Sequence, residues 1–587
     1  MDSNARHPYR WGYADTQLEL DGPRSVRMTG ARYPLSGRSM PHLIPFVEQT
    51  LGLPFNPAAV VPEVPPVIPP ARVDPALMAA LERVLPPDRR STDPEARLAH
   101  SHGQLAIGEV DRLLYGGRFA RIADVVVEPA NEDDVRAVIA AAVEHDACLV
   151  PFGGGTNVSG ALTCPDDEAR TIVSIDMRRM NRVLSVDRLN GCALVEAGIT
   201  GAELEDALGK LGYTCGHTPD SIEFSTLGGW IATNASGMKK NRYGNIEDIV
   251  IEATLVTPAG VVETRRPAAR TSTGVQPMSL LFGSEGNLGV ITKALVAIHP
   301  TPEECRYGSL VFRRFADGVA FLKEVRARAA LPASIRLVNN REFRLGQSLR
   351  PDVHGVRAWK ATLQRAWLFR VLGFDPDDVA ACTIVMEGGR EEVARQEDTL
   401  RRLAKRFRAV WGGAENGRRG YSLTFAIAYL RDFFSRFGIL AESFETSVPW
   451  DRIEAVCTSV ERAMASECAA RGVVGRPYLS YRVTQTYHTG VCVYFTMALS
   501  GAGLADAASV FHDIEAALRQ VILDGGGSLS HHHGVGKIRQ QFLPQVHSAA
   551  GLDAIRAAKR AVDPGNVFGI ANGACGRGRQ LTAEQRA

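Results

Sequence analysis

Apolar and polar positions along the chain follow two periods, which together predict an alternation of helices and strands. Over residues 131–143 the apolar positions recur at helical spacing, and Asn131 is placed to cap that helix. The apolar run Cys148–Phe152 then predicts a buried strand. Three consecutive glycines, Gly153–Gly155, follow this strand directly. The chain therefore contains a helix and a strand that lead into a glycine-rich loop.

That loop has the composition of an anion-binding turn. Glycine adopts positive φ and leaves no Cβ between the backbone and a ligand, so successive N–H groups can surround a pyrophosphate. The stretch lacks the G-x-G-x-x-G spacing of a Rossmann motif, and no Lys-Ser or Lys-Thr pair follows it as in a P-loop. Taken alone, the loop is as compatible with a tight structural turn as with a cofactor site.

Three further stretches before residue 300 are distinctive. Thr200–Leu211 reads as a helix whose first turn carries a capping box of Thr200 and Glu203. Cys215–Gly237 is rich in hydroxyl, amide and glycine residues and has too few apolar residues for a core element. This composition favours a role in wrapping a polar ligand. Gly283–Thr292 is a second glycine-rich loop that runs into a strand.

Beyond about residue 300 the pattern alternates between strands and amphipathic helices, as in a mixed α+β domain. The predicted strands span residues 309–312, 334–337, 383–387, 479–486 and 490–498. The predicted helices span residues 315–328, 390–406, 451–471 and 505–524.

The length of 587 residues predicts two or three domains. We expect an N-terminal extension with a proline-rich connector and helices over residues 1–117, irregular over residues 1–53. Residues 118–300 form the domain with the glycine loops, and residues 301–504 form a cap domain. Residues 505–587 form a C-terminal helical segment with a histidine-rich loop, and the family resemblance described below implies that this loop returns to the domain at 118–300.

Composition narrows the class of protein. Apolar residues make up 45% of the chain and charged residues 22%, as in an ordinary globular enzyme. The 67 Lys and Arg nearly balance the 65 Asp and Glu, so nothing indicates a nucleic-acid partner. The ten cysteines include no C-x-x-C pair, which favours reduced thiols over disulfides or a zinc site.

Several blocks together resemble the alkyldihydroxyacetonephosphate synthase family of vanillyl-alcohol-oxidase (PCMH-type) flavoproteins. The resemblance covers Trp11 to about Gly569. It rests on Arg32–Gly37, Pro151–Ser159, Gly216–Asp248, Glu285–Ile291, Glu442–Asp451, Arg482–Tyr487 and Ser528–Gly536. It implies an α+β fold, in which a two-subdomain PCMH-type FAD-binding domain carries an α+β cap domain and an N-terminal helical extension.

The resemblance also implies FAD as the cofactor, held non-covalently by four loops that match the family's cofactor contacts. The expected contacts are Pro151, Phe152, Gly153, Gly154, Gly155, Thr156, Asn157, Ser159, Asp220, Ser221, Ile222, Glu223, Phe224, Ser225, Thr226, Thr233, Asn234, Ala235, Ser236, Glu285, Gly286, Asn287, Leu288, Gly289, Val290 and Ile291. Ordinary loop chemistry would explain one such loop, but four in register are hard to explain without a cofactor.

The implied reaction replaces the acyl chain of 1-acyl-dihydroxyacetone phosphate by a long-chain fatty alcohol, without net redox change. The flavin would serve as the nucleophile and the protein would supply position and proton transfer. Tyr494 matches the family's proton-transferring tyrosine, although its strand pattern alone favours a core tyrosine. Arg431 matches a substrate-binding arginine of the family, and the alternative is an ion pair with Asp432 or another surface acid. Arg336 lies between apolar residues on a predicted strand, so we expect it to bind a buried anion and count it among the substrate-binding residues. His217 lies at the flavin-side loop, where the alternatives are substrate binding, tuning of the flavin and capping of the turn.

His531, His532 and His533 match the family's histidine cluster, which the resemblance implies is needed for activity. On a strand, His531 and His533 would share one face and His532 would point to the other. We therefore expect no metal site there, but proton transfer and phosphate hydrogen bonding.

The expected partners are the lipid substrates, with a homodimer also compatible with the family. Residues 356–374 interleave tryptophans with Arg and Lys, which favours either an interfacial helix on a membrane or a surface helix with its tryptophans packed inward. No peroxisomal or secretory signal is visible, so we expect a cytoplasmic protein with peripheral membrane contact.

The rival function on the same fold is an FAD-dependent 2-hydroxy-acid dehydrogenase or oxidase of the D-lactate or glycolate type. A flavin-containing scaffold without turnover is disfavoured, because no expected site residue is missing.

Overall fold

The computed structural model describes residues 5–328, 331–351, 359, 363, 366–422 and 427–576. Contacts divide the chain into two compact units, each assembled from separated segments. Unit 1 comprises Met1–Val64, Met238–Arg242 and Pro302–Ser528, and unit 2 comprises Pro65–Gly237, Tyr243–Thr301 and Leu529–Ala587. The four-part division predicted from the sequence stays a prediction. Its boundaries at 117/118 and 504/505 differ from those of the contact units, which lie at 64/65 and 528/529.

Unit 2 contains a four-stranded sheet in the order β4-β5-β7-β6 and a five-stranded sheet in the order β12-β11-β13-β9-β8. Its strands are β4 (Arg90–Ser91), β5 (Val125–Val127), β6 (Cys148–Phe152), β7 (Ile172–Asp176), β8 (Val183–Asp187), β9 (Cys192–Glu196), β10 (Tyr213–Thr214), β11 (Val250–Thr257), β12 (Gly260–Val262), β13 (Val290–Ala297) and β14 (His299–Pro300). Its helices are α2 (Pro75–Val84), α3 (Pro94–Ala99), α4 (Ile107–Leu114), α5 (Glu132–Glu144), α6 (Gly201–Gly209), α7 (Leu227–Thr233), α9 (Ile246–Ile249), α18 (Leu543–Val546) and α19 (Ala549–Val562).

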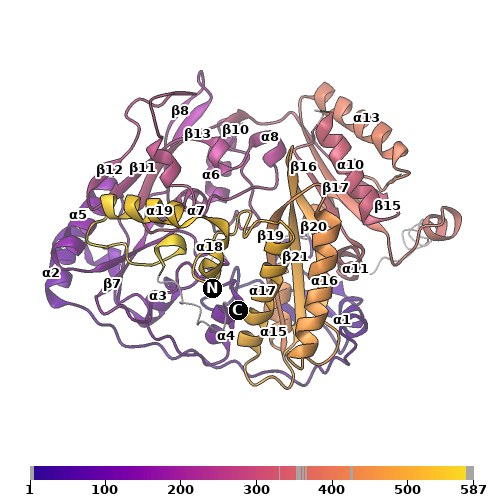
Figure 1. The fold of residues 1–587 in the computed structure, drawn as a ribbon, viewed down its shortest axis with the longest axis horizontal. Helices are drawn as coiled ribbons and strands as arrows, with labels where there is room; N and C mark the ends of the chain where they lie inside the picture. Colours follow the sequence, from indigo (N-terminus) through magenta and orange to yellow (C-terminus); the bar gives the residue numbers. More distant parts are fainter. Residues whose placement is uncertain are drawn as a thin grey trace. The chain divides into compact units, whose positions relative to one another are not determined.

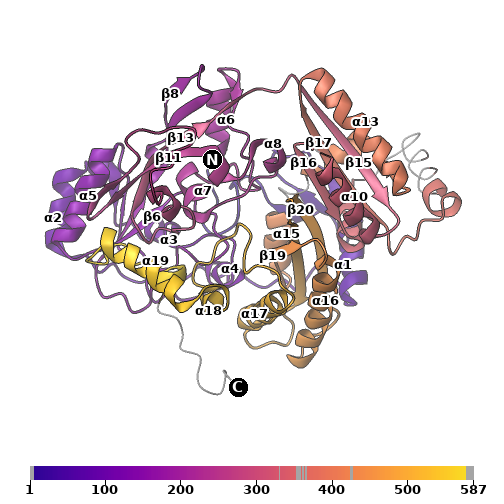
Figure 2. The same ribbon diagram turned by 45° about the horizontal axis from the view of Figure 1, so that its top comes forward.

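The local signals predicted for unit 2 are present. Asn131 caps α5 by accepting a hydrogen bond from the Asp134 amide, and Thr200 with Glu203 forms the capping box of α6. Helices α2 and α5 lie side by side and share a core with the four-stranded sheet (Figures 1 and 2). Strand β6 runs parallel to β7 and delivers the glycine loop at its end.

The prediction that Cys215–Gly237 contributes no core element is wrong. Leu227, Trp230 and Ile231 of α7 are buried in the core of the five-stranded sheet. Three apolar residues suffice because Gly228 lets the helix pack closely against the backbone at Ala197. A Cβ on Gly228 would lie 3.1 Å from the carbonyl oxygen of Ala197. The short helix is therefore both a core element and part of a polar stretch.

Unit 1 is built on a seven-stranded antiparallel sheet in the order β18-β15-β17-β16-β20-β21-β19. Its strands are β1 (Leu18–Leu20), β2 (Val26–Met28), β3 (Ser39–Met40), β15 (Glu304–Phe312), β16 (Ser334–Val338), β17 (Ala380–Gly388), β18 (Val410–Trp411), β19 (Ile439–Pro449), β20 (Tyr478–Thr486) and β21 (Gly490–Ser500). Its helices are α1 (Leu43–Leu51), α10 (Phe315–Ala327), α11 (Asn340–Ser348), α13 (Arg390–Arg406), α14 (Ala414–Ser422), α15 (Ile427–Ser435), α16 (Ile453–Ala470) and α17 (Ala507–Asp524), and the short α8 (Lys240–Tyr243) begins in it.

The prediction of an irregular segment over residues 1–53 is also wrong. Strands β1, β2 and β3 form a small antiparallel sheet, and α1 follows them. The side chains of Leu18, Val26, Met28 and Met40 are buried there. Strands of two or three residues leave too short an alternation to be read from sequence.

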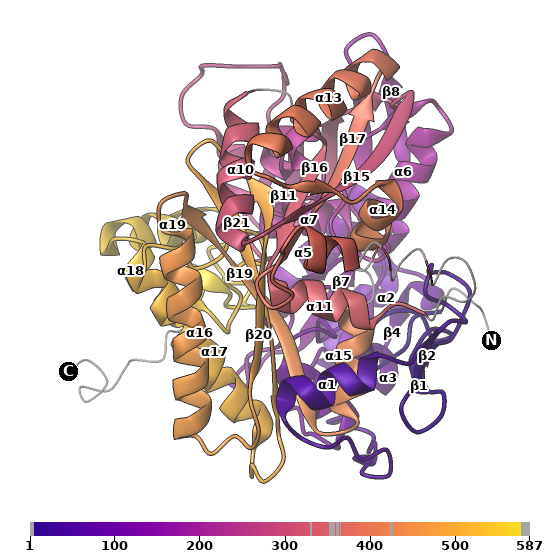
Figure 3. The same cartoon turned by 90° about the vertical axis from the view of Figure 1, so that its right-hand side faces the viewer.

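The large sheet has two different faces. Phe444 of β19 and Phe495 of β21 pair across the strands and stack with ring centroids 5.1 Å apart. Arg519 of α17 lies over the Phe444 ring, so this face is covered by α17 and its neighbour α16 (Figure 3). Because side chains alternate along a strand, the adjacent residues Glu445 and Tyr494 point to the opposite face.

Candidate active site

The glycine loop after β6 touches a second predicted cofactor loop through its backbone. A Cβ on Gly154 would lie 1.9 Å from the carbonyl oxygen of Phe224, and one on Gly153 would lie 2.4 Å from Thr226 Oγ1. No side chain fits at either position. The loop Pro151–Asn157 and the loop Asp220–Thr226 are thus brought together as the sequence predicts.

The third and fourth predicted loops join the same region of unit 2. Asn234 ends α7 with a left-handed φ of 52°, and Ser236 donates a hydrogen bond to Asn245. The Glu285 amide donates to the carbonyl oxygen of Ala232, and a Cβ on Gly286 would lie 3.4 Å from Pro151 Cδ. All four loops therefore lie along one contiguous stretch of the unit.

Several buried polar atoms in this region have no protein partner within the described part of the chain. They are Asn157 Nδ2, Ser159 Oγ, Thr218 Oγ1 and both ring nitrogens of His217. A buried polar group without a hydrogen bond is costly, so such a cluster is typical of a ligand site. Glycines without room for a Cβ and unsatisfied donors fit a dinucleotide cofactor such as FAD.

His217 is the most perturbed of these groups. Its ring packs on Trp230 with a centroid distance of 4.6 Å, and the side chain is 1% exposed. Burial, together with the nearby His532, lowers the pKa of His217 to about 3. The imidazole is therefore neutral near pH 7, where it can donate one hydrogen bond and accept another.

The prediction that His531–His533 lie on a strand is wrong. These residues form a bend, and His531 Nδ1 lies 2.9 Å from His532 Nδ1. The rings of His532 and His533 are also in contact, with centroids 4.6 Å apart. Strand alternation would have separated neighbouring rings, whereas positive φ values at Gly534 and Gly536 turn the backbone directly after the histidines.

In unit 1, Tyr494 lies on the sheet face opposite the stacked phenylalanines. Arg482 of β20 pairs with Tyr494 in register, and its guanidinium carbon lies 4.2 Å from the centre of the Tyr494 ring. Arg482 donates to Glu342 Oε1 at 2.7 Å. The fully buried Glu445 lies opposite Tyr494 on β19. Tyr494 is thus placed among charged groups, on the face opposite the aromatic core.

Both predicted substrate-binding arginines are also in unit 1, and both are buried. Arg336 lies on β16 with 6% of its surface exposed. Arg431 lies on α15 and donates through Nε and Nη2 to Asp432 Oδ1, at 2.9 and 2.6 Å. The ion pair that the sequence left as the alternative for Arg431 is therefore present.

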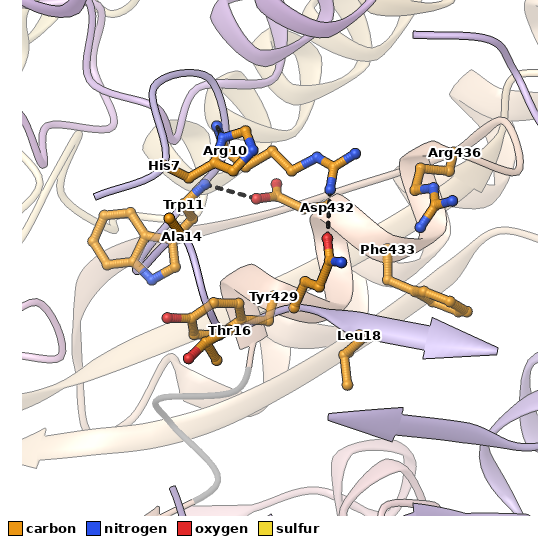
Figure 4. Close-up of a pocket in the computed structure, with 11 residues that line it drawn as sticks. His7, Arg10, Trp11, Ala14, Thr16, Leu18, Tyr429, Asp432, Phe433 and Arg436 are labelled. Carbon is orange, nitrogen blue, oxygen red and sulfur yellow. Dashed lines mark hydrogen bonds between the residues drawn. The ribbon is translucent and has the colours of Figure 1, made fainter. Parts of the chain in front are cut away.

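Asp432 also holds the N-terminal segment. Its second oxygen accepts the Trp11 amide at 2.8 Å, as Figure 4 shows, and Arg10 donates to Gln17 Oε1 at 2.7 Å. These residues line a small pocket between the N-terminal segment and α15. The segment therefore fixes the carboxylate that holds Arg431.

Sequence reasoning gave no role to Arg482, Glu342 or Glu445. The available signal was a charged residue between apolar neighbours on a predicted strand, which singled out Arg336 and applies equally to Arg482. Glu342 offered no such pattern, because it lies on α11 and reaches Arg482 from outside the sheet.

Comparisons with known proteins bear on the whole chain. The family model "FAD binding domain" matches residues 123–265, and "FAD linked oxidases, C-terminal domain" matches residues 301–569. Alkyldihydroxyacetonephosphate synthase of Caenorhabditis elegans is 42% identical over 96% of this chain and 94% of its own length. The chain belongs to the alkyldihydroxyacetonephosphate synthase family.

Two further comparisons agree with this family assignment. The Dictyostelium discoideum enzyme of that name is 30% identical over 95% of this chain and 92% of its own. A solved structure of an alkyldihydroxyacetonephosphate synthase matches with a TM-score of 0.82 at 27% identity, over 98% of this chain and 99% of that one. These matches confirm the predicted α+β fold with its FAD-binding domain. The chain is an FAD-dependent enzyme of this family.

The close approach of the first two loops predicts the effect of a single methyl group. Gly154→Ala places Cβ against the Phe224 carbonyl, so the loops must separate, and overpacking of this kind costs about 1–3 kcal/mol. We expect the FAD content of the purified protein to fall by about tenfold. Gly209→Ala in α6 is the matched control, because nothing lies within 4 Å of its Cβ. Full FAD loading of Gly154→Ala would contradict this account of the loop.

The burial of His217 predicts a pH dependence of stability. Its folded-state pKa of about 3 lies below the unfolded value of about 6.5, so the unfolded chain takes up the proton first as the pH falls. Stability from this group is complete above about pH 6.5 and declines toward about pH 3. The loss between about pH 7 and pH 5 is about 2 kcal/mol.

Urea unfolding of the wild type and His217→Gln at both pH values measures this difference. The substitution should remove most of the decline, whereas His488→Gln, at an exposed histidine, should leave it in place. Equal declines in the wild type and His217→Gln would show that His217 is not buried in its neutral form.

Proposed function

We propose that the protein replaces the acyl chain of 1-acyl-dihydroxyacetone phosphate by a long-chain fatty alcohol, giving 1-alkyl-dihydroxyacetone phosphate without net redox change. The observation that carries this proposal is the 42% identity to an alkyldihydroxyacetonephosphate synthase over nearly the whole of both chains. The same family implies ether-lipid synthesis as the process served.

In this proposal the four loops of unit 2 hold FAD. When bound, FAD would supply the reactive centre for the exchange at the substrate carbon, in which the acyl-bearing oxygen leaves and the oxygen of the fatty alcohol enters. The backbone of Pro151–Asn157 binds the pyrophosphate, supported by the absence of room for any Cβ at Gly153 and Gly154. The buried donors of Asn157 and the ring of His217 provide further hydrogen bonds toward the cofactor or the substrate.

We assign the proton transfer at the substrate carbon to Tyr494. The guanidinium of Arg482 on its ring face holds the phenol in one orientation, and Glu342 holds that guanidinium in turn. A phenol fixed in this way can remove and return a proton without rearrangement.

The other groups handle anions and protons. We assign proton transfer and phosphate hydrogen bonding to His531, His532 and His533, supported by the hydrogen-bonded contact between the first two rings. Arg336 and Arg431 are assigned to the substrate phosphate and the departing carboxylate, because a buried guanidinium binds such anions in a fixed geometry.

Turnover of acyl-dihydroxyacetone phosphate with labelled hexadecanol tests the reaction. Alkyl product and free fatty acid should form in equal amounts, and Tyr494→Phe should lower kcat by at least about 100-fold, because general acid–base groups typically contribute that much. Tyr481→Phe is the matched control, since Tyr481 lies on the same sheet but packs against Phe315 and Phe495. Steady dye reduction with lactate or glycolate, and no ether product, would favour the hydroxy-acid oxidase instead.

We further propose a peripheral membrane contact through residues 356–374. Residues 356–358, 360–362 and 364–365 of this stretch lie outside the described residues. Those described at helical spacing, Trp359, Leu363, Trp367 and Val371, are 48–69% exposed. No described helix has the length and hydropathy that a membrane crossing requires. Exposed tryptophans on one face support a segment that lies on a lipid surface.

Sedimentation with phospholipid vesicles measures this contact. The double variant Trp359→Ala/Trp367→Ala should lower the vesicle partition coefficient by at least about 100-fold, because burying each large apolar side chain in lipid is worth about 1.5–3 kcal/mol and about 1.4 kcal/mol is a factor of ten. Leu189→Ala, at another highly exposed apolar residue, should leave it unchanged. Equal binding of the double variant and the wild type would remove these tryptophans from any membrane contact.

We also propose a cytoplasmic location with peripheral membrane attachment, supported by the proposed lipid substrates and the exposed tryptophans. A homodimer is compatible with the family, and light scattering of the purified protein measures its mass directly.

A further inference from the structure

The carboxylate of Glu285 binds the backbone of the histidine loop. Glu285 Oε1 accepts the amides of Val535 and Gly536, both at 2.9 Å, and Oε2 accepts the Gly536 amide at 3.0 Å. The residue is 8% exposed and has a left-handed φ of 45°. A non-glycine residue in this conformation is strained unless its surroundings require it. Here the strain orients one side chain toward a segment 250 residues away.

Two close contacts explain the two glycines after the histidines, the Glu285 carboxylate at Gly534 and the Ser159 backbone at Gly536. A Cβ on Gly534 would lie 2.3 Å from Glu285 Oε1, and a Cβ on Gly536 would lie 2.1 Å from the carbonyl oxygen of Ser159. Both glycines also have positive φ. The motif His531–Gly536 therefore needs glycine because the carboxylate on one side and the first cofactor loop on the other leave no space.

A second set of contacts fixes Glu285 itself. Asn572 Nδ2 donates to the carbonyl oxygens of Glu285 and Ala161, at 2.8 and 2.9 Å. Lys537 Nζ donates to Asn572 Oδ1 at 2.8 Å. Arg539, which has no exposed surface, donates to the carbonyl oxygens of Gly534 and Val158. Glu285 and the backbone that it binds are thus both held in place, so the histidines extend from a backbone segment of fixed position.

We propose that Glu285 is a positioning residue, whose carboxylate sets the place of His531–His533 relative to the cofactor loops. The sequence led us to expect Glu285 among the FAD contacts, but its side chain binds protein backbone. This inference rests on the proposed function, in which the histidines transfer protons and bind phosphate. A carboxylate is required because two oxygens with lone pairs face two N–H groups, and charge strengthens each bond.

The substitutions Glu285→Gln and Glu285→Asp separate the charge from the reach of the side chain. Glutamine replaces one oxygen by an NH₂ group that faces the Gly536 amide, and aspartate shortens the chain by one methylene. Glu196→Gln is the matched control, because Glu196 is equally buried in unit 2 but pairs with Arg182. Each variant is purified as the full chain with bound FAD.

Three measurements are made on each variant: bound FAD, hydrogen exchange of the peptide over residues 530–540, and the pH profiles of kcat and KM. We expect Glu285→Gln to accelerate exchange at Val535 and Gly536 by at least tenfold and to retain FAD within about twofold. We expect kcat to fall at least tenfold with KM changed by less than threefold, and the pH profile of kcat to shift. Glu196→Gln should change none of these.

The proposal is overturned if Glu285→Gln loses FAD while the exchange of residues 530–540 stays slow, because the carboxylate would then serve the cofactor. It is equally overturned if exchange accelerates and both kcat and its pH profile remain those of the wild type. Absence of ether product from the wild type would refute the proposed function alone. The exchange and FAD measurements would still show which group the carboxylate holds.

Discussion

The geometry of unit 2 depends on one backbone-to-backbone approach, in which the carbonyl of Phe224 occupies the space that a side chain at residue 154 would need. Two loops that are far apart in sequence are brought into close contact by this approach, and the side chain of Thr226 lies against Gly153 as well. Helix α7 follows directly from the second loop and is anchored in the core by Trp230. The polar loops are therefore tied to the apolar interior within a few residues.

In the sheet of unit 1, the alternation of side chains along the strands gives the two faces different chemistry. Phe495 packs under the covering helices, and its neighbour Tyr494 points to the face where the charged groups lie. One strand thus supplies both a ring of the aromatic core and a phenol among charged groups. The Arg482 guanidinium connects Tyr494 to Glu342 of α11, so the orientation of the phenol depends on a helix outside the sheet.

Signals confined to a few neighbouring residues could be read from the sequence. The cap at Asn131, the capping box at Thr200 and the alternation in β20 and β21 are of this kind, and all are present. Long-range contacts could not be read. The bend at His531–His533 depends on Glu285, and the ion pair of Arg482 with Glu342 joins a strand to a separate helix. The resemblance singled out His531–His533 and Glu285, but only the structure shows which groups their side chains contact.

The discontinuity of unit 2 has a consequence for how the protein is made. Its first cofactor loop emerges early from the ribosome, but Val535, Gly536 and Asn572, which complete the surroundings of Glu285, emerge only after all of unit 1. Until then the Glu285 carboxylate lacks the backbone amides that it accepts in the folded protein. The surroundings of Glu285 are therefore completed only after unit 1 has been synthesised, and a nascent chain interrupted inside unit 1 lacks them.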